Sequence, residues 1–206
     1  MYPALQSASL TVAAFVRHRL ETDPVLSAFF DPASGGTLIV SINNPQEMSD
    51  AHQEGVSLWM YRLIRDADRL NQPNTRLNGR ESRFPSLPLR LHYLVTPFVR
   101  AGSPNSAELE QRILGKVMQT FHDHPRFRGG DLEGDLSGSG QEFQVSLESL
   151  PLEDIARVWN ALNQPYQLSV SYEAAVVNID SELIESVAPV QSAEPVSAVI
   201  VGGGAP

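Results

Sequence analysis

The chain of 206 residues contains no cysteine. Disulfide bonds, thiolate zinc sites and cysteine nucleophiles are therefore excluded. Lysine is nearly absent too, because Lys116 is the single lysine among fifteen basic residues. The remaining basic residues are arginines, whose planar guanidinium group binds carboxylates in a fixed geometry. This bias favours paired or interface contacts over bulk solubility.

The sequence also has no long hydrophobic run. No apolar segment approaches the roughly 20 residues that a membrane-spanning helix needs. The N-terminal stretch MYPALQSASL lacks the basic start and the continuous apolar block of a signal peptide. We therefore expect no direct membrane insertion, and we expect synthesis and assembly in the cytoplasm, with export by another route as the alternative.

Positive charge is scarce, since the formal net charge is −9. An acidic chain repels phosphate backbones unless its basic residues cluster, so we expect no nucleic-acid partner. Catalytic motifs are missing as well: there is no G-x-S-x-G, no H-E-x-x-H, no P-loop and no Rossmann glycine fingerprint. We predict no enzymatic activity, no cofactor and no metal site.

The composition that remains is that of a soluble globular protein, with 42% hydrophobic and 19% charged residues. Helical periodicity predicts helices over residues 4–22, between Asn105 and Pro125, and over 151–162. Asn105 and Glu108 have the spacing of a capping box at the start of the second helix. Alternating or continuous apolar patterns predict strands, which are residues 37–42, 56–68, 88–98, 142–150 and 166–179.

The order of these elements shows no repeated β-α-β alternation. We therefore predict an α+β fold with an antiparallel sheet of about four to five strands and about three helices on one face. The long strands 56–68 and 88–98 read as a hairpin with an oversized tip. Because connections longer than ~12 residues are usually functional or disordered, this tip is a contact candidate. It carries Arg76, Arg80 and Arg83.

The strand PLRLHYLVTPF, residues 88–98, has a polar side with Arg90 and His92. Leu89, Leu91, Tyr93 and Val95 point the other way and predict a core face. The polar side is either a reaction centre or the outer surface of a half-buried sheet. A hydrolase or isomerase would need His92 or His122 beside a carboxylate in a pocket. We expect a surface, and specifically an assembly surface.

Two other groups invite a metal hypothesis. His122 and His124 could chelate together only if the helix has already ended, so we favour a helix C-terminus with histidines complementing the dipole. The carboxylates of Asp131, Glu133 and Asp135 alternate as in a calcium loop, but a glutamate at the twelfth position is missing. We expect a solvated turn there.

Four aromatic residues are expected in the core, because each falls on an apolar stripe. They are Trp59, Tyr61, Tyr93 and Trp159.

The composition changes from about Ser181 onward to small residues, prolines and a glycine run. We therefore predict one domain over residues 1–180 and an extended or flexible arm over residues 181–206. Within the arm, VSAVIV has strong strand propensity and is expected to pair with a sheet edge of a partner. The residues expected to form this strand are Val196, Val199, Ile200 and Val201.

Four segments together resemble the N-terminal domain of the cap protein of extracellular contractile injection systems, which are phage-tail-like particles. These segments are LWMYRLIRDADRLNQP, LPLRLHYLVTPF, AELEQRILGKVMQTFHDHP and ALNQPYQLSVSYEAAVVNID. The resemblance runs from about Tyr2 to Ile179 and keeps order and spacing. Its family-motif residues include Tyr61, Arg62, Leu91, Tyr93, Trp159 and Tyr166.

The resemblance implies a fold similar to phage tail terminators and a homohexameric ring. Such a ring closes the baseplate-distal end of the particle by binding the last tube or sheath ring, or both, and so stops polymerisation. It also implies tube and sheath proteins as partners, and incorporation into a particle that can be released from the cell. In this setting we expect Arg76, Arg80 and Arg83 to contact the adjoining ring or subunit. The alternative is a cap adaptor or accessory binding module.

Overall fold

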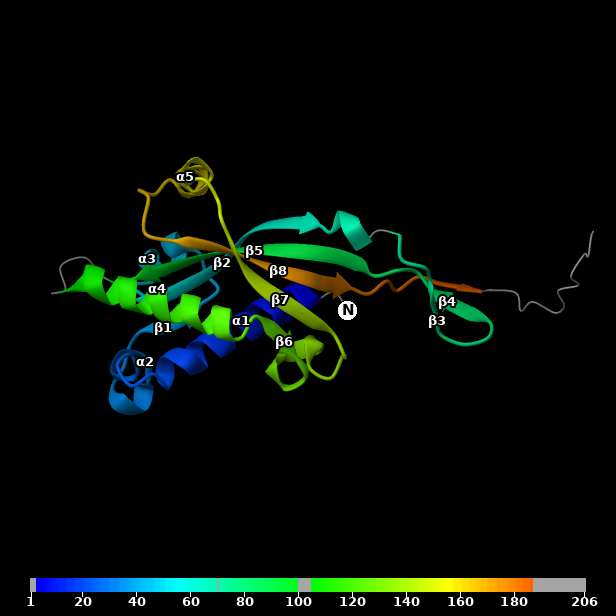
Figure 1. Cartoon of the computed structure of the whole chain (residues 1–206), viewed down its shortest axis with the longest axis horizontal. Coiled ribbons are helices and arrows are strands. Elements are labelled where there is room, and N and C mark those ends of the chain that lie inside the picture. The colour runs from blue at the N-terminus through cyan, green and yellow to red at the C-terminus, as the bar shows by residue number, and fades with distance from the viewer. Residues whose placement is uncertain (1–2, 70, 100–104, 187–206) are drawn as a thin grey trace, which may run out of the picture. The chain divides into compact units, whose positions relative to one another are not determined.

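The computed structural model describes residues 3–69, 71–99 and 105–186. The chain divides into two compact units (Figure 1). The larger unit comprises Met1–Gln72 and Ser86–Asp180, and the smaller unit comprises Pro73–Pro85 and Ser181–Pro206. The strand predicted at residues 196–201 lies outside the described residues. The boundary predicted at residue 180 stays a prediction.

The larger unit is built on a six-stranded sheet. All neighbouring strands pair antiparallel except β1 and β2, which run parallel. The predicted central hairpin is confirmed, because β2 and β5 pair along their length from Gly55 opposite Phe98 to Arg65 opposite Leu89. In order across the sheet, the strands are β1 (Ile39–Ser41), β2 (Gly55–Arg65), β5 (Leu87–Phe98), β8 (Val170–Ile179), β7 (Glu142–Glu148) and β6 (Arg126–Arg128).

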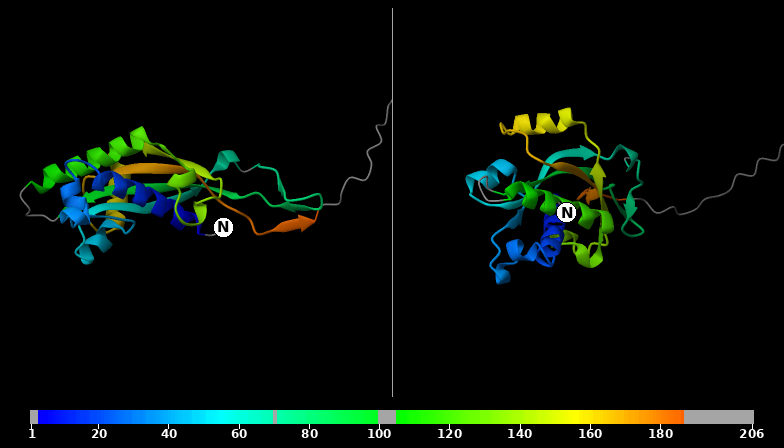
Figure 2. Two further views of the ribbon diagram at one scale, coloured as in Figure 1. Left: turned by 90° about the horizontal axis from the view of Figure 1, so that it is seen from below. Right: turned by 60° about the vertical axis from the view of Figure 1, so that its left-hand side comes forward.

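Helices lie on both faces of this sheet (Figure 2). α1 (Ala4–Glu21) and α4 (Ser106–Asp123) lie together on one face, whereas α5 (Leu152–Ala161) lies on the other. The expectation that all helices share one face is therefore wrong for α5. This helix connects β7 to β8 and buries the side chain of Trp159, whose Nε1 donates a hydrogen bond to Ser169 Oγ at 3.1 Å.

Two shorter helices complete the α content: α2 (Ser27–Phe30) and α3 (Pro45–Asp50). α3 begins with a capping box, in which the Asn44 side chain accepts from the Glu47 amide and the Glu47 side chain accepts from the Asn44 amide. The 3-10 turns cover Pro32–Ser34, Ala67–Arg69, Gly129–Asp131 and Gly134–Leu136.

The core fills the space between the sheet and the two long helices. Leu89, Leu91, Tyr93 and Val95 of β5 are buried there, as their alternation predicts. Each fully buried aliphatic side chain of this kind stabilises the fold by about 1.5–3 kcal/mol. The helices contribute one apolar stripe each, which consists of Ala4, Ala8, Val12, Val16 and Leu20 of α1 and Ile113, Leu114, Val117 and Phe121 of α4.

The smaller unit contains a three-stranded sheet in the order β3-β4-β9. β3 (Thr75–Arg76) and β4 (Glu81–Arg83) come from the tip of the central hairpin, and β9 (Ile184–Ser186) comes from the segment after the larger unit. The long connector is therefore a short hairpin to which a distant part of the chain adds a strand.

None of the helices in the described residues is both long and apolar enough to cross a membrane.

Candidate functional site

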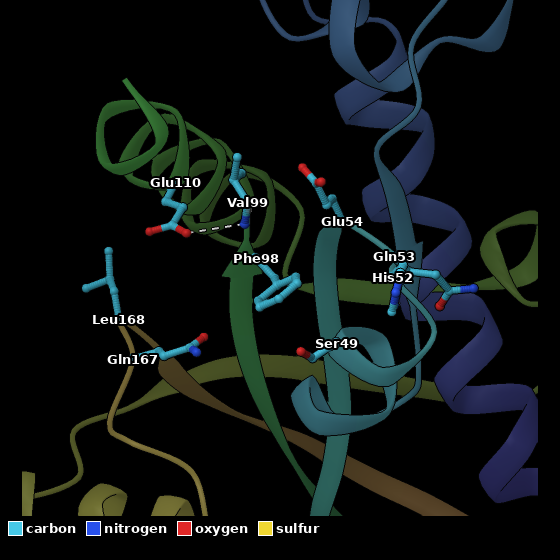
Figure 3. Close-up of a pocket in the computed structure, with 9 residues that line it drawn as sticks. All are labelled: Ser49, His52, Gln53, Glu54, Phe98, Val99, Glu110, Gln167 and Leu168. Atoms are coloured by element: carbon cyan, nitrogen blue, oxygen red, sulfur yellow. Dashed lines mark hydrogen bonds between the residues drawn. The ribbon is translucent and has the colours of Figure 1, made fainter. Parts of the chain in front are cut away.

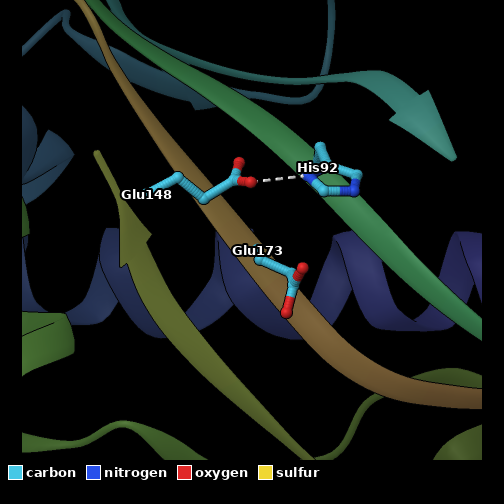
Figure 4. A group of neighbouring side chains, drawn as sticks. All are labelled: His92, Glu148 and Glu173. Atoms are coloured by element: carbon cyan, nitrogen blue, oxygen red, sulfur yellow. Dashed lines mark hydrogen bonds and ion pairs between the residues drawn. The ribbon is translucent and has the colours of Figure 1, made fainter. Parts of the chain in front are cut away.

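A network of polar side chains covers the middle of the sheet on the face opposite the core. The register places Arg62, His92 and Glu173 directly opposite one another on β2, β5 and β8. Directly opposite residues share one face of an antiparallel sheet, so three strands bring their polar side chains together. The fourth strand, β7, contributes Glu148. Figure 4 shows three members of the network, His92, Glu148 and Glu173.

His92 is the most enclosed member of the network, with a relative exposure of 3%. Its Nδ1 atom lies 2.9 Å from Glu148 Oε1 (Figure 4). The other carboxylate oxygen of Glu148 accepts a hydrogen bond from Ser171 Oγ. The Tyr61 hydroxyl lies 3.0 Å from the same Ser171 Oγ. Burial raises the pKa of Tyr61, although the Ser171 hydrogen bond opposes the shift, so this hydroxyl keeps its proton at neutral pH.

Arg90 connects the polar face of the sheet to the residues that follow β2. Its guanidinium group contacts Asp66 Oδ1 at 3.2 Å, Glu173 Oε1 at 3.2 Å and Asp68 Oδ2 at 3.4 Å. The hydrogen bond with Asp66 is the main reason why the pKa of Arg90 is raised. The Asp66 side chain is only 2% exposed, so Arg90 pairs with an enclosed carboxylate. The network therefore holds the hairpin together.

This arrangement corrects the expectation for the polar side of β5, which is not a solvent-facing or assembly surface. His92, Leu94 and Thr96 are all buried at 3% exposure or less. Partners from β7 and β8 pair the charged groups of this face, because Glu148 contacts His92 Nδ1 and Glu173 contacts Arg90. Two buried polar atoms, His92 Nε2 and Thr96 Oγ1, have no hydrogen-bond partner among the described residues. Sequence reasoning recognised Arg90 and His92 as a pair with acidic neighbours, but it could not identify Glu148, which is 56 residues away from His92.

The network fits a structural role better than a catalytic or metal-binding one. Ligand atoms of His92, Glu148 and Glu173 lie within 4.8 Å of one another. However, Arg90 contacts Glu173, while Ser171 and His92 contact Glu148, so both carboxylates are already paired within the network. None of the main pockets in the described part of the chain is lined by His92.

The two other metal candidates do not converge on an ion. α4 ends at Asp123, and His124 accepts a hydrogen bond at Nε2 from Arg19 at 2.9 Å, while His122 lines a separate groove. In the acidic turn, the Glu133 amide donates to Thr11 Oγ1 at 2.9 Å and the Asp135 amide donates to Ser7 Oγ at 3.1 Å. The backbone of this turn is thus fastened to α1.

A cavity of about 570 Å³, with both polar and apolar side chains in its wall, lies where β5 ends (Figure 3). The carboxylate of Glu110 accepts a hydrogen bond from the Val99 amide at 3.2 Å at its wall (Figure 3). The His52 ring faces the Asp50 carbonyl oxygen at 3.2 Å rather than a nucleophile. Ser49 and His52 both line the cavity, but no hydrogen bond between their side chains is found among the described residues. Its lining consists of Ser49, His52, Gln53, Glu54, Phe98, Val99, Glu110, Gln167 and Leu168.

The three predicted contact arginines lie in the smaller unit. Arg76 stands opposite Ser82, whereas Arg83 stands opposite Thr75 and Ile184, so Arg76 and Arg83 occupy opposite faces of the small sheet. None of these arginines forms an ion pair with another described residue. The expected basic loop is electrically balanced, because the described part of this unit also contains three glutamates, which are Glu81, Glu182 and Glu185.

The smaller unit also exposes apolar side chains, a feature that sequence reasoning missed. Leu183 is 65% exposed and Ile184 is 54% exposed. The signal in the sequence was this apolar pair, which lies shortly after Asp180. The pair was interpreted as part of an arm that does not fold by itself. Leu77 and Phe84 of the hairpin tip are also exposed, at 41% and 42%.

The family-motif residues fall into two groups. Leu91, Tyr93 and Trp159 are buried, and the Tyr93 hydroxyl lies 2.9 Å from Ser9 Oγ. The others reach the surface more: Tyr61 is half-buried, while Arg62 and Tyr166 are exposed. The core expectation is confirmed for Tyr93 and Trp159, whereas Trp59 and Tyr61 are only half-buried. What these motif residues do for function stays a prediction.

The fold is similar to those of two solved tube terminators. The sheath/tube terminator of the PVC extracellular contractile injection system, in its extended state, matches with a TM-score of 0.63 at 14% identity, over 97% of this chain and 65% of that one. The cap of the anti-feeding prophage, which terminates its tube, matches with a TM-score of 0.58 at 16% identity, over 90% of this chain and 60% of that one. The predicted α+β class is therefore confirmed.

The sequence gives the family directly. The family model of the Pvc16 N-terminal domain matches residues 9–193, and the chain belongs to this family. No curated protein matches the chain. The chain spans less than two thirds of the length of either terminator described above. The predicted resemblance to cap proteins of contractile injection systems is confirmed.

Proposed function

We propose that this chain caps a contractile injection particle at its baseplate-distal end, where it binds the last tube or sheath ring, or both, and stops polymerisation. The observation that carries the proposal is the likeness to a sheath/tube terminator over 97% of the chain, together with membership of the Pvc16 N-terminal domain family. A role without catalysis belongs to the same proposal, and the burial of the His92–Glu148 pair in the middle of the sheet supports it. Assembly in the cytoplasm and later release with the particle belong to the same proposal.

A terminator needs one surface that matches the growing end and another that does not copy it. The smaller unit is suited to be the matching surface, because it combines exposed apolar side chains with arginines that have no ion-pair partner among the described residues. An interface would bury the exposed apolar side chains, and acidic groups of the adjoining ring would pair with the arginines. Arg76, Arg80 and Arg83 are the proposed ring contacts.

The proposed cap is a homohexameric ring whose subunits also meet through the arm. Val196, Val199, Ile200 and Val201 supply the strand-forming side chains of that arm. Strand addition gives affinity through main-chain hydrogen bonds, which do not depend on a perfect match of side chains. Truncation after Asp180 removes both β9 and the arm, and it should abolish ring formation.

The test is to express the chain together with the tube and sheath proteins of its particle and to examine particle ends by electron microscopy. Without the chain, particles should have irregular lengths and open ends. Reversing the charge at Arg76, Arg80 and Arg83 should leave the monomer folded but remove the chain from particle ends. The matched control reverses Arg65, Arg69 and Arg157, which are exposed in the larger unit. Normally capped particles from the first variant would refute the role of these arginines.

The adaptor alternative predicts a different pattern in the same experiment. An adaptor would leave particle lengths unchanged when it is absent, and a second protein would be lost from the particle end. A cap would change the lengths themselves. The length distribution therefore separates the two functions.

A further inference from the structure

One edge of the larger sheet is only partly covered. β6 pairs with β7 over Glu142–Gln144, and the Val145 amide then donates to the Pro125 carbonyl oxygen at 2.7 Å. Beyond this point the chain lies in the end of α4, so within the described residues the stretch Ser146–Glu148 pairs with β8 alone. Half of β7 thus has an open edge.

The backbone at this edge is oriented for pairing. Amides of alternate residues in a strand point to the same side, so the Leu147 amide and carbonyl point to the open side, as the Val145 amide does. No hydrogen bond to the Leu147 backbone on that side exists in the part of the chain that the structure describes. An incoming strand would find a donor and an acceptor there.

An apolar groove of about 570 Å³ runs beside this edge, between β7 and the C-terminal half of α4. Figure 1 shows the two elements side by side. Leu147, which is 50% exposed, lines the groove. A strand added to β7 would place every second side chain into it, which would bury Leu147. Other lining residues are Met118, Gln119, Phe121, His122, Pro125, Gln144, Val145, Ser146 and Tyr172.

The other edges of this sheet are protected. Arg17 Nη2 donates to the carbonyl oxygen of Val40 at 3.1 Å on the outer strand β1. The outer strand β6 is three residues long and presents exposed Arg126 and Arg128 on either side of Phe127. Charged side chains and short strands are how proteins discourage pairing at an edge. The edge at Leu147 has neither protection.

We propose that this edge of β7 accepts the strand Val196–Val201 from a second copy of the chain. The inference rests on the proposed ring and names how its subunits join. The hexad carries β-branched residues at Val196, Val199, Ile200 and Val201, which suit a pleated surface. Nine residues, 187–195, separate it from β9 and can extend over at most about 30 Å, enough to reach a neighbouring subunit. Head-to-tail donation closes into a ring when each copy both gives and receives a strand.

The absence of cysteine makes the test clean. One copy carries Ser146→Cys, and another carries a single cysteine at position 198, 199 or 200, because both faces of the added strand have to be sampled. A disulfide requires Cβ atoms about 4 Å apart, so only neighbouring strands cross-link. We expect covalent dimers from at least one mixture and a ladder of larger species from the chain that carries both cysteines. The control replaces Ser146→Cys with Arg157→Cys on α5 and should give no dimer.

Three outcomes would overturn the inference. They are rings without any intermolecular cross-link at the three arm positions, a cross-link formed within single chains only, and rings that survive Leu147→Asp unchanged. Leu147→Asp places a charge in the groove and should abolish the cross-link, whereas Leu152→Asp on α5, at a position 62% exposed, should not. If Leu147→Asp rings still cap particles, the strand exchange is wrong and the cap function stands. If cross-linked rings form but never sit at particle ends, the cap function is wrong and the strand exchange stands.

Discussion

The two units of the chain differ in how far they bury their apolar side chains. In the larger unit, Leu91 and Phe121 are 0% and 2% exposed, whereas in the smaller unit Leu183 and Ile184 are 65% and 54% exposed. Strands of two or three residues in a three-stranded sheet bury too little surface to be stable unless they pack on something else. The contrast indicates that the larger unit contains the hydrophobic core that carries the fold, and it fits the proposal that the smaller unit is an assembly surface.

The first way to break this comparison is to create a cavity in the larger unit. Phe121 packs edge-on against Tyr172, with ring centroids 4.8 Å apart. Phe121→Ala should lower the free energy of unfolding by about 3–5 kcal/mol, through lost transfer energy and the cavity left behind. Urea denaturation measures the change. Phe29→Ala, at a position 40% exposed in the same unit, is the control and should change the stability far less. A loss below about 1 kcal/mol for Phe121→Ala would show that the core does not carry the fold.

Alkaline pH should act next, again on the larger unit. Burial raises the pKa of Tyr93 from 10.0 to about 12, although the hydrogen bond to Ser9 opposes this. A raised folded pKa means that the stabilisation is complete below the unfolded value and is lost as the pH rises through the folded value. The urea midpoint should therefore hold steady up to pH 10.0 and fall as the pH approaches about 12.

Tyr93→Phe should make this alkaline fall shallower, because one ionisable hydroxyl is gone. It should not remove the fall, since burial also raises the pKa of Tyr172 to about 12. Tyr166→Phe, at a position 49% exposed, serves as the control and should leave the profile unchanged. An identical profile for Tyr93→Phe and the unaltered chain would contradict the burial of this hydroxyl.

The larger unit was also the more predictable one. Alternation over residues 88–98 correctly assigned Leu89, Leu91, Tyr93 and Val95 to the core, because a strand has a fixed period of two. The pattern could not show that the opposite face is enclosed. His92 is buried through Glu148, and a contact between residues so far apart leaves no local signal.

Helix starts show the same limit. The capping-box spacing at Asn105 and Glu108 predicted a side-chain cap, but Asn105 adopts a left-handed conformation with φ of 68° and makes no cap hydrogen bond. A capping box forms instead at Asn44 and Glu47, at the start of a helix too short to show a period. Spacing identifies which residues can cap, and the backbone that enters the helix decides whether they do.

The smaller unit was least predictable, because its sheet joins segments about 100 residues apart. β4 pairs with β9 through Ser82 opposite Glu185, although the sequence around Glu185 reads as a polar arm. Such a pairing depends on where the long hairpin places its tip, which composition does not encode. For the same reason the charge balance of Arg76, Arg80 and Arg83 with nearby glutamates was not apparent from the hairpin alone.

The smallest expected effect on stability sharpens the comparison most. Phe84 of the smaller unit and Phe29 of the larger unit are almost equally exposed, at 42% and 40%. Replacing either with serine should change the free energy of unfolding by less than about 0.5 kcal/mol, as is usual for surface positions. If the smaller unit is the assembly surface, only Phe84→Ser should reduce the fraction of particle ends that carry the chain. Counting labelled ends by electron microscopy measures that fraction. Equal occupancy for the two variants would mean that the exposed apolar residues of the smaller unit have another purpose, whereas a loss confined to Phe84→Ser would tie its exposure to the partner ring.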